Sequence, residues 1–163
     1  MLAHSVAVEV EAAVVVADDF YAGRRDEDWL SHSPRDRVDK VLDWRRLRSE
    51  ALEPLLARRP ATWHPLDFEP GVGWIGWKRE TVTVEPADVV LVDGAYSARP
   101  ELSDLIDLVV LIEAPEAIRR SRLRDREGEH VIQSWHSLWD AAEDIYFSEI
   151  RPPAWFDLVL QGT

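Results

Sequence analysis

The chain has 163 residues and a mass of 18.7 kDa, enough for one ordinary domain, and its 46% hydrophobic content excludes general disorder. It has no cysteine, which excludes disulfide frameworks, cysteine-based zinc sites and thiol catalysis. The net charge of −12 argues against a nucleic-acid partner, and the lack of a long apolar run or a signal sequence predicts a cytoplasmic protein with no membrane partner.

The predicted strands are short apolar segments, and the last three lack the alternation of a strand with one solvated face. Such runs are typical of strands covered on both faces of a parallel sheet. The segments are residues 14–17, 89–92, 108–112 and 157–160. The opening segment, about residues 2–13, is compatible with either a strand or a helix. Its apolar residues fit the two-residue period of a strand and the 3.6-residue period of a helix about equally well.

Helical patterns lie between these strands. Ser33 is predicted to cap a helix that begins at Pro34, and Asp43 could likewise cap a helix with an inner apolar stripe. Further helices are expected from Pro115 to about Arg126 and over 130–148. Strands alternating with helices predict an α/β fold with a parallel sheet. Residues 59–85 are expected to form a small antiparallel hairpin excursion.

Two acidic residues stand at the predicted ends of strands. Asp18 follows the first strand, where a carboxylate can accept a proton from a substrate hydroxyl or hold that hydroxyl for attack. Asp93 ends a run of four apolar residues, as in the Walker B pattern that helps to hold Mg²⁺. The alternative for both is a turn or a helix cap, positions where Asp is common.

Residues 71–76 formally match the GxGxxG pattern of nucleotide loops. A dinucleotide loop needs a strand before this pattern and a helix after it. Pro65 and Pro70 precede it here, and the strand-like segment Thr81 to Val84 follows it. We therefore favour a mobile hairpin tip over a nucleotide loop.

An arginine-rich segment lies between residues 119 and 126. Arg120 and Arg124 are four residues apart, hence on one helical face, and converging guanidiniums suit polyphosphate recognition. The alternative is a solvated helix face whose charge is offset by the many acids. The five histidines show no metal-ligand spacing.

Taken together, three segments resemble the uridine kinase family of P-loop kinases. They are the DDFY sequence of residues 18–21, the KRETVTVEPADVVLVDG sequence of residues 78–94 and the arginine-rich residues 119–125. The resemblance runs from about Leu2 to the C-terminus. It implies a single domain over 1–163 with a three-layer P-loop kinase-like fold, a hairpin excursion at about 59–85 and a lid at about 119–130. It also implies ATP-dependent phosphotransfer to a hydroxyl of a small substrate, with ATP and Mg²⁺ and with a nucleoside as the expected acceptor.

The family's functional residues carry over by position. Asp18 matches the acid that activates or orients the acceptor hydroxyl, and Arg120 and Arg124 match lid arginines that contact phosphates. Asp93 matches the Walker B acid at the metal. The implied substrate-binding residues are Tyr21, Asp43, Asp67, Phe68 and Arg126. Asp18, Arg120 and Arg124 are therefore expected to converge on one cleft over the carboxyl edge of the sheet.

Departures from the family leave other interpretations open. The sequence contains no GxxxxGK[ST] loop, and it is expected to begin about one strand and one loop late, as an N-terminally truncated domain with little kinase activity. No histidine follows Asp67 and Phe68 within residues 69–77, where the family contacts a pyrimidine. One alternative is a catalytically inactive pseudokinase that binds a nucleoside-like ligand or a protein partner. Another is a kinase that acts on a phosphosugar or a vitamin precursor. The sequence is also compatible with a homo-oligomer.

Overall fold

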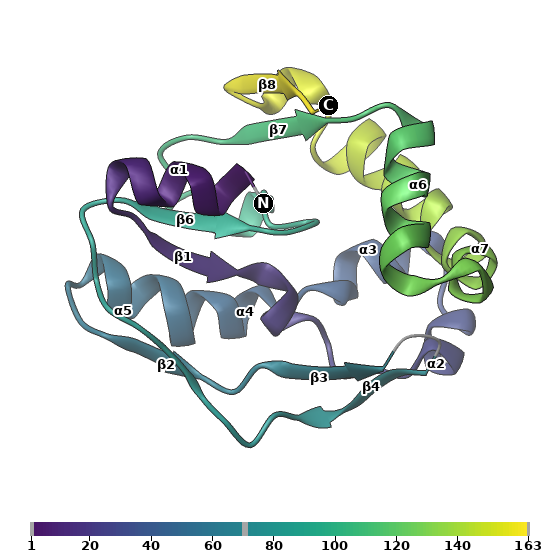
Figure 1. The fold of residues 1–163 in the computed structure, drawn as a ribbon, viewed down its shortest axis with the longest axis horizontal. Coiled ribbons are helices and arrows are strands. Elements are labelled where there is room, and N and C mark those ends of the chain that lie inside the picture. The colour runs from purple at the N-terminus through teal and green to yellow at the C-terminus, as the bar shows by residue number, and fades with distance from the viewer. Residues whose placement is uncertain (1, 70–71, 163) are drawn as a thin grey trace. The chain divides into compact units, whose positions relative to one another are not determined.

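The computed structural model describes residues 2–69 and 72–162 (Figure 1). Gly71, the first glycine of the GxGxxG pattern, lies outside the described residues. The chain divides into two compact units by its internal contacts. The first unit comprises Met1–Gly23, Lys40–Asp67 and Trp74–Ser97, and the second comprises Arg24–Asp39, Phe68–Gly73 and Ala98–Thr163.

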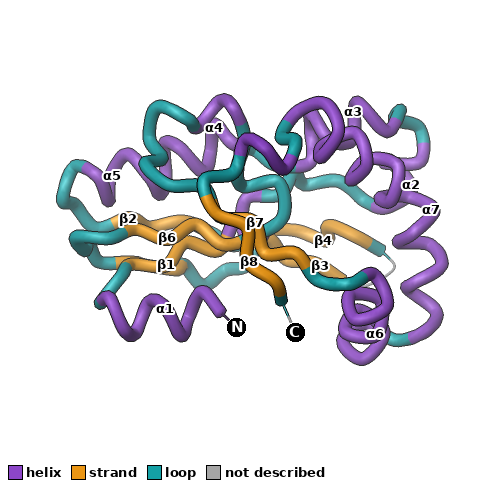
Figure 2. Tube along the Cα trace, turned by 90° about the horizontal axis from the view of Figure 1, so that it is seen from above, coloured by secondary structure: helices purple, strands orange, loops and turns teal. Residues whose placement is uncertain are grey.

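The first unit is built around one pair of parallel strands. Its elements are α1 (Leu2–Val10), β1 (Ala13–Val16), α4 (Trp44–Arg46), α5 (Glu53–Leu56), β2 (Ala61–Trp63), β5 (Val82–Val84) and β6 (Val90–Asp93). Strands β1 and β6 pair in a register that puts Val16 opposite Asp93, so both strands end at the same edge. Helix α1 lies on one side of this pair and the α4–α5 segment lies on the other (Figures 1 and 2).

The core of the first unit follows from the helical periodicity read in the sequence. The side chains of Leu47, Ala51 and Leu55 are buried, as their spacing on one helical face predicts. A π-helical turn, Leu47–Leu52, joins α4 to α5 within this stretch. The Asp43 carboxylate accepts a hydrogen bond of 3.1 Å from the Arg46 backbone N–H, so the predicted cap of this helix is confirmed.

The antiparallel excursion is also confirmed. Strand β2 pairs with β5 in an antiparallel register, and β3 (Leu66–Glu69) pairs with β4 (Gly73–Trp77) as a hairpin. A strand rather than a helix therefore begins at Gly73, the second glycine of the GxGxxG pattern. Gly73 has φ of +87°, and a Cβ there would lie 2.7 Å from the backbone N of Asp26. Its lack of a side chain is thus explained by packing within the second unit.

The second unit contains a second pair of parallel strands and a helical layer. Its elements are α2 (Asp26–Leu30), most of α3 (Pro34–Val41), β7 (Val110–Glu113), α6 (Glu116–Glu127), α7 (Glu129–Ile145) and β8 (Leu158–Gln161). The buried guanidinium of Arg37 donates to the Trp29 carbonyl at 2.9 Å and to the Leu138 carbonyl at 2.5 Å. Trp29 also meets Trp139 edge-on, with ring centroids 5.4 Å apart. These contacts join α2, α3 and α7.

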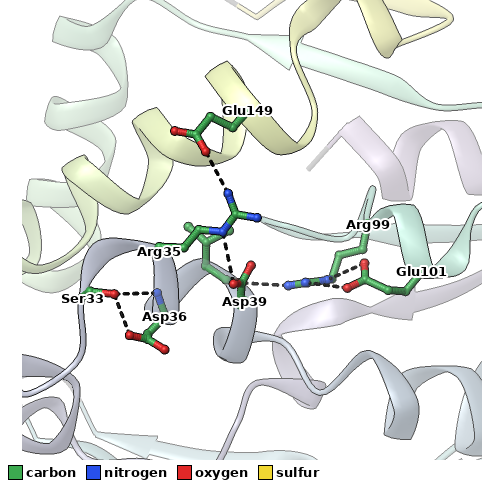
Figure 3. A network of polar contacts seen from close by, with 8 residues as sticks. Ser33, Arg35, Asp36, Asp39, Arg99, Glu101 and Glu149 are labelled. Atoms are coloured by element: carbon green, nitrogen blue, oxygen red, sulfur yellow. Dashed lines mark hydrogen bonds and ion pairs between the residues drawn. The ribbon is translucent and has the colours of Figure 1, made fainter.

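A polar network surrounds the start of α3 (Figure 3). The Ser33 hydroxyl accepts from the Asp36 backbone N–H at 3.1 Å, which confirms the predicted cap. Arg35 lies between the carboxylates of Asp39 and Glu149. Arg99, only 3% exposed, donates to the carbonyl of Val38 at 2.7 Å and pairs with Glu101 at 2.8 Å.

The strands that sequence analysis predicted all form, each shifted by one or two residues, and the ambiguous opening segment is a helix. The sequence predicted one continuous parallel sheet, and the structure differs from this prediction. Among the described residues, the parallel pairing consists of two separate pairs, β1 with β6 and β7 with β8. The two pairs belong to different units of the chain.

The parallel strands β7 and β8 expose several apolar side chains to solvent. Val110, Ile112 and Leu158 are between 39% and 46% exposed. Strands of a parallel pair are usually covered on both faces, so this exposure is unusual.

No helix in the described part of the chain is both long enough and apolar enough to cross a bilayer.

Candidate functional site

The first candidate site is the end of the β1–β6 pair. Asp18 lies in the 3₁₀ turn Ala17–Phe20 that directly follows β1, and its side chain is exposed. Asp93 is the last residue of β6 and is half-buried. Because the register places the ends of both strands together, this edge of the first unit carries two carboxylates. That is the edge at which open α/β sheets bind ligands.

Gly94 leaves the space that Asp18 occupies. A Cβ at position 94 would lie 3.0 Å from Asp18 Oδ1, closer than ordinary van der Waals contact. The Ser97 hydroxyl donates to the Gly94 carbonyl at 2.8 Å, which fixes the turn after β6. The Asp-Gly pair at 93 and 94 is thus a turn whose glycine lets a second carboxylate come close.

The neighbouring acid, Asp19, has a packing role. Its Oδ2 accepts from the Trp63 indole Nε1 at 2.9 Å, and its backbone carbonyl accepts from Arg46 at 3.3 Å. Asp18 and Asp19 therefore differ although they are adjacent, since Asp18 is exposed and Asp19 is tied to the core.

Arg46 is a residue that sequence analysis did not single out. Its guanidinium lies over the rings of Phe20 and Trp77, at 4.9 and 4.3 Å from their centroids. It also pairs with Glu50 at 2.9 Å and donates to the His64 carbonyl at 2.6 Å. The spacing of Arg46 and Glu50 was visible in the sequence, but the aromatic partners come from distant segments.

The predicted substrate-binding residues are distributed over both units. Tyr21 forms an isolated antiparallel bridge with Leu42, which keeps it near the start of α4. Asp43 is the cap of α4, so the carboxylate proposed to bind substrate also has a structural role. Asp67 is half-buried in the first unit, whereas Phe68, 43% exposed, belongs to the second.

The arginine-rich helix α6 lies in the second unit. Arg120 pairs with Glu116 at 2.6 Å and faces Asp140 of α7 at 3.9 Å. Arg119 pairs with Glu143 of α7 at 2.5 Å. Arg124 is exposed, and the side chain of Arg126 lies outside the described residues. The predicted convergence of Asp18 with Arg120 and Arg124 joins residues of different units and stays a prediction.

A pocket of about 390 Å³ lies between α6 and α7. Its polar lining comprises two guanidiniums, four carboxylates and one imidazole, from Glu116, Arg119, Arg120, His136, Asp140, Glu143 and Asp144. Leu123 and Phe147 supply an apolar part. Carboxylates outnumber guanidiniums, so an anion that enters this pocket must compete with carboxylates of the chain itself.

Burial changes the acidity of two side chains in the second unit. It raises the pKa of the Asp26 carboxyl above its usual value. Burial also raises the pKa of Tyr146 to about 12, and the nearby charge of Arg151 opposes this change.

Among the described residues, no three or more His, Cys, Asp or Glu side chains come together as a metal site. Asp93 remains the predicted Mg²⁺ contact. One carboxylate is compatible with this metal, because Mg²⁺ is commonly held by one or two carboxylates together with waters and substrate phosphates.

No protein-family model and no curated protein matches this sequence. Among solved structures, the chain is similar to one described as a possible uridine kinase from Bacillus stearothermophilus, at 19% sequence identity and a TM-score of 0.70. The similarity covers 98% of this chain and 79% of that chain. The two proteins share a fold. This agrees with the P-loop kinase-like architecture implied by the sequence resemblance, and with the mixed α/β elements described above.

Proposed function

We propose that this chain binds a small hydroxyl-bearing substrate, with a nucleoside as the first candidate, and presents its hydroxyl for phosphotransfer from ATP. The observation that supports this most directly is the exposed Asp18 carboxylate at the shared end of β1 and β6. The fold shared with a possible uridine kinase is the second support.

The role proposed for Asp18 is to orient an acceptor hydroxyl. A carboxylate accepts hydrogen bonds, so it can hold the hydroxyl oxygen in place and take its proton as the oxygen attacks. Asp19 is less suited to this role, because its side chain is only partly exposed and one of its oxygens accepts from Trp63. The different environments of these adjacent acids make Asp18 the candidate catalytic residue.

Asp93 is the residue that would hold Mg²⁺, and the metal would neutralise charge on the transferring phosphate. The cationic side chains proposed for the phosphates are Arg120 and Arg124, which match lid arginines in the family resemblance. Phosphotransfer depends on positioning and charge neutralisation rather than covalent chemistry, and these are the roles proposed for the named residues.

A second candidate is a nucleoside-binding protein that transfers no phosphate. The specific observation in its favour is that Arg120 already pairs with Glu116 and faces Asp140. This arrangement makes Arg120 less available to a triphosphate.

Calorimetric titration of the 163-residue chain with uridine, cytidine and adenosine tests the proposal. Asp18→Asn should weaken binding of the preferred nucleoside by about 5- to 10-fold, because the hydroxyl then bonds to a neutral amide oxygen in place of a carboxylate. Asp19→Asn is the matched control, since it removes the same charge one residue away and retains an oxygen that accepts from Trp63. Its affinity should stay close to that of the unmodified chain.

Two results would contradict the proposal: no nucleoside binds, or Asp18→Asn binds as tightly as the unmodified chain. Formation of the nucleoside monophosphate with ATP and Mg²⁺ then separates the two candidates. Product that disappears with Asp18→Asn supports the kinase, and binding without product supports the second candidate.

A further inference from the structure

The carboxylate of Asp140 has two partners in the α6–α7 pocket. Its Oδ1 lies 2.8 Å from His136 Nδ1, and its Oδ2 faces Arg120 Nη2 at 3.9 Å. A carboxylate oxygen can only accept, so the bond to His136 requires the proton on Nδ1. His136 Nε2 is buried and has no hydrogen-bond partner among the described residues.

This bond fixes the direction of Asp140. A free aspartate on an exposed helix face would turn toward solvent and lose little free energy. Here the imidazole, with a side chain that is 22% exposed, holds one oxygen, and the other oxygen is directed to the guanidinium of Arg120. His136 and Asp140 are four residues apart on α7, so the helix itself sets their distance.

The guanidinium of Arg120 is therefore approached by carboxylates from two helices. Glu116 of its own helix contacts Nη2 at 2.6 Å, and Asp140 faces the same nitrogen from α7. Arg119 pairs with Glu143 of α7 in the same way. Both arginines of the pocket are thus neutralised by the chain, although their side chains are 50% and 47% exposed and open to an anion from solvent.

We propose that Asp140, oriented by His136, competes with anionic ligands for the guanidinium of Arg120, so that a polyphosphate binds there more weakly than it would beside Glu116 alone. The inference rests on the proposed role of Arg120 as a phosphate contact. Asp140 is then a positioning residue that weakens anion binding. Removing its charge should strengthen anion binding rather than weaken it.

The test measures the affinity of inorganic tripolyphosphate for the full chain, at constant low salt, by isothermal titration calorimetry. Asp140→Asn should bind the probe about 2- to 5-fold more tightly than the control, the range expected from an exposed ion pair of up to about 1 kcal/mol. The control is Asp144→Asn, which removes the same charge from the same helix and pocket. Asp144 forms no side-chain ion pair among the described residues, so it reports only the change in overall charge.

A second pair of variants separates competition from structural disturbance. In an Arg120→Gln background, Asp140→Asn should have no larger effect than Asp144→Asn, because the guanidinium at issue is gone. Asp140→Glu should return the affinity toward that of the unmodified chain. Thermal unfolding should show that all variants are folded.

Equal effects of Asp140→Asn and Asp144→Asn would overturn the inference, as would an effect that persists without Arg120. Absence of tripolyphosphate binding in every variant would overturn it too. None of these results bears on the proposed nucleoside site at Asp18, which is tested separately by nucleoside binding. Conversely, a chain that shows the Asp140 effect but binds no nucleoside would refute the proposed function and leave this inference standing.

Discussion

Gly94 packs directly against Asp18. A methyl group on Gly94 would lie 3.0 Å from Asp18 Oδ1 and 2.8 Å from Cβ of Ala17. Gly94 also has φ of +151°, a conformation that residues with a side chain rarely adopt. The position of the candidate catalytic carboxylate thus depends on a missing side chain at the end of the neighbouring strand.

Gly94→Ala should lower the free energy of unfolding by about 1–3 kcal/mol through backbone strain and crowding. Gly76→Ala is a matched control, because Gly76 has φ of +154° and a methyl group there would meet no described atom within 4 Å. Urea denaturation of both variants therefore separates strain from crowding. Equal losses of stability would show that the contact with Asp18 relaxes without cost.

Arg46 is expected to be the most sensitive charged position of the first unit. Arg46→Ala removes two aromatic contacts, the pair with Glu50 and the bond to the His64 carbonyl, and should cost about 2–4 kcal/mol. Arg45→Ala removes a stacking contact with Trp44 at 4.3 Å and should cost less than about 1 kcal/mol. Chemical denaturation checks both values, and similar losses at the two positions would argue against the role assigned to Arg46.

Glu101 compensates a buried charge. Arg99 is 3% exposed, so Glu101→Gln should leave its guanidinium short of a counter-charge and cost about 1–3 kcal/mol. Glu149→Gln breaks the exposed pair with Arg35, whose side chains are 52% and 59% exposed, and should change stability by no more than about 0.5 kcal/mol. Thermal unfolding of the two variants gives the comparison. If Glu149→Gln proved the more damaging change, the assignment of burial as the cause would be wrong.

The buried phenol of Tyr146 predicts a loss of stability at alkaline pH. Its pKa is about 12 in the folded chain against 10.0 as the ordinary value, so between these values the unfolded chain releases a proton that the folded chain keeps. This contribution is complete below pH 10 and is lost as the pH rises toward 12, by about 2–3 kcal/mol in total. Tyr146→Phe should remove that part of the slope when unfolding is followed from about pH 9 to about pH 12. An unchanged slope would contradict the assignment.

Much of the fold could be predicted from the sequence, because its signals are local. Ser33 and Asp43 cap helices as their positions before helical patterns indicated, and the stripe at Leu47, Ala51 and Leu55 is buried. The opening segment could not be assigned, since alternating Val and a helical apolar face coincide there. Packing against β1 and β6, which periodicity does not record, accompanies the helix that forms.

Only part of the candidate site could be predicted from the sequence. Asp18 and Asp93 could be placed at strand ends from the apolar runs that precede them, but the register that brings these ends together depends on pairing between strands far apart in the chain. The proposed competition between Asp140 and anionic ligands for Arg120 could not be predicted from the sequence. Its carboxylates, Glu116 and Asp140, belong to different helices, and only the packing of α6 on α7 brings the second one near.

The exposed apolar side chains of β7 and β8 have a practical consequence. Short runs such as Val110–Glu113 and Leu158–Gln161 combine high β-propensity with little charge and no proline, the composition of segments that stack between molecules. The net charge of −12 repels whole molecules at long range, but added salt screens it. Storage in concentrated, high-salt solution should therefore promote aggregation that begins at these two strands.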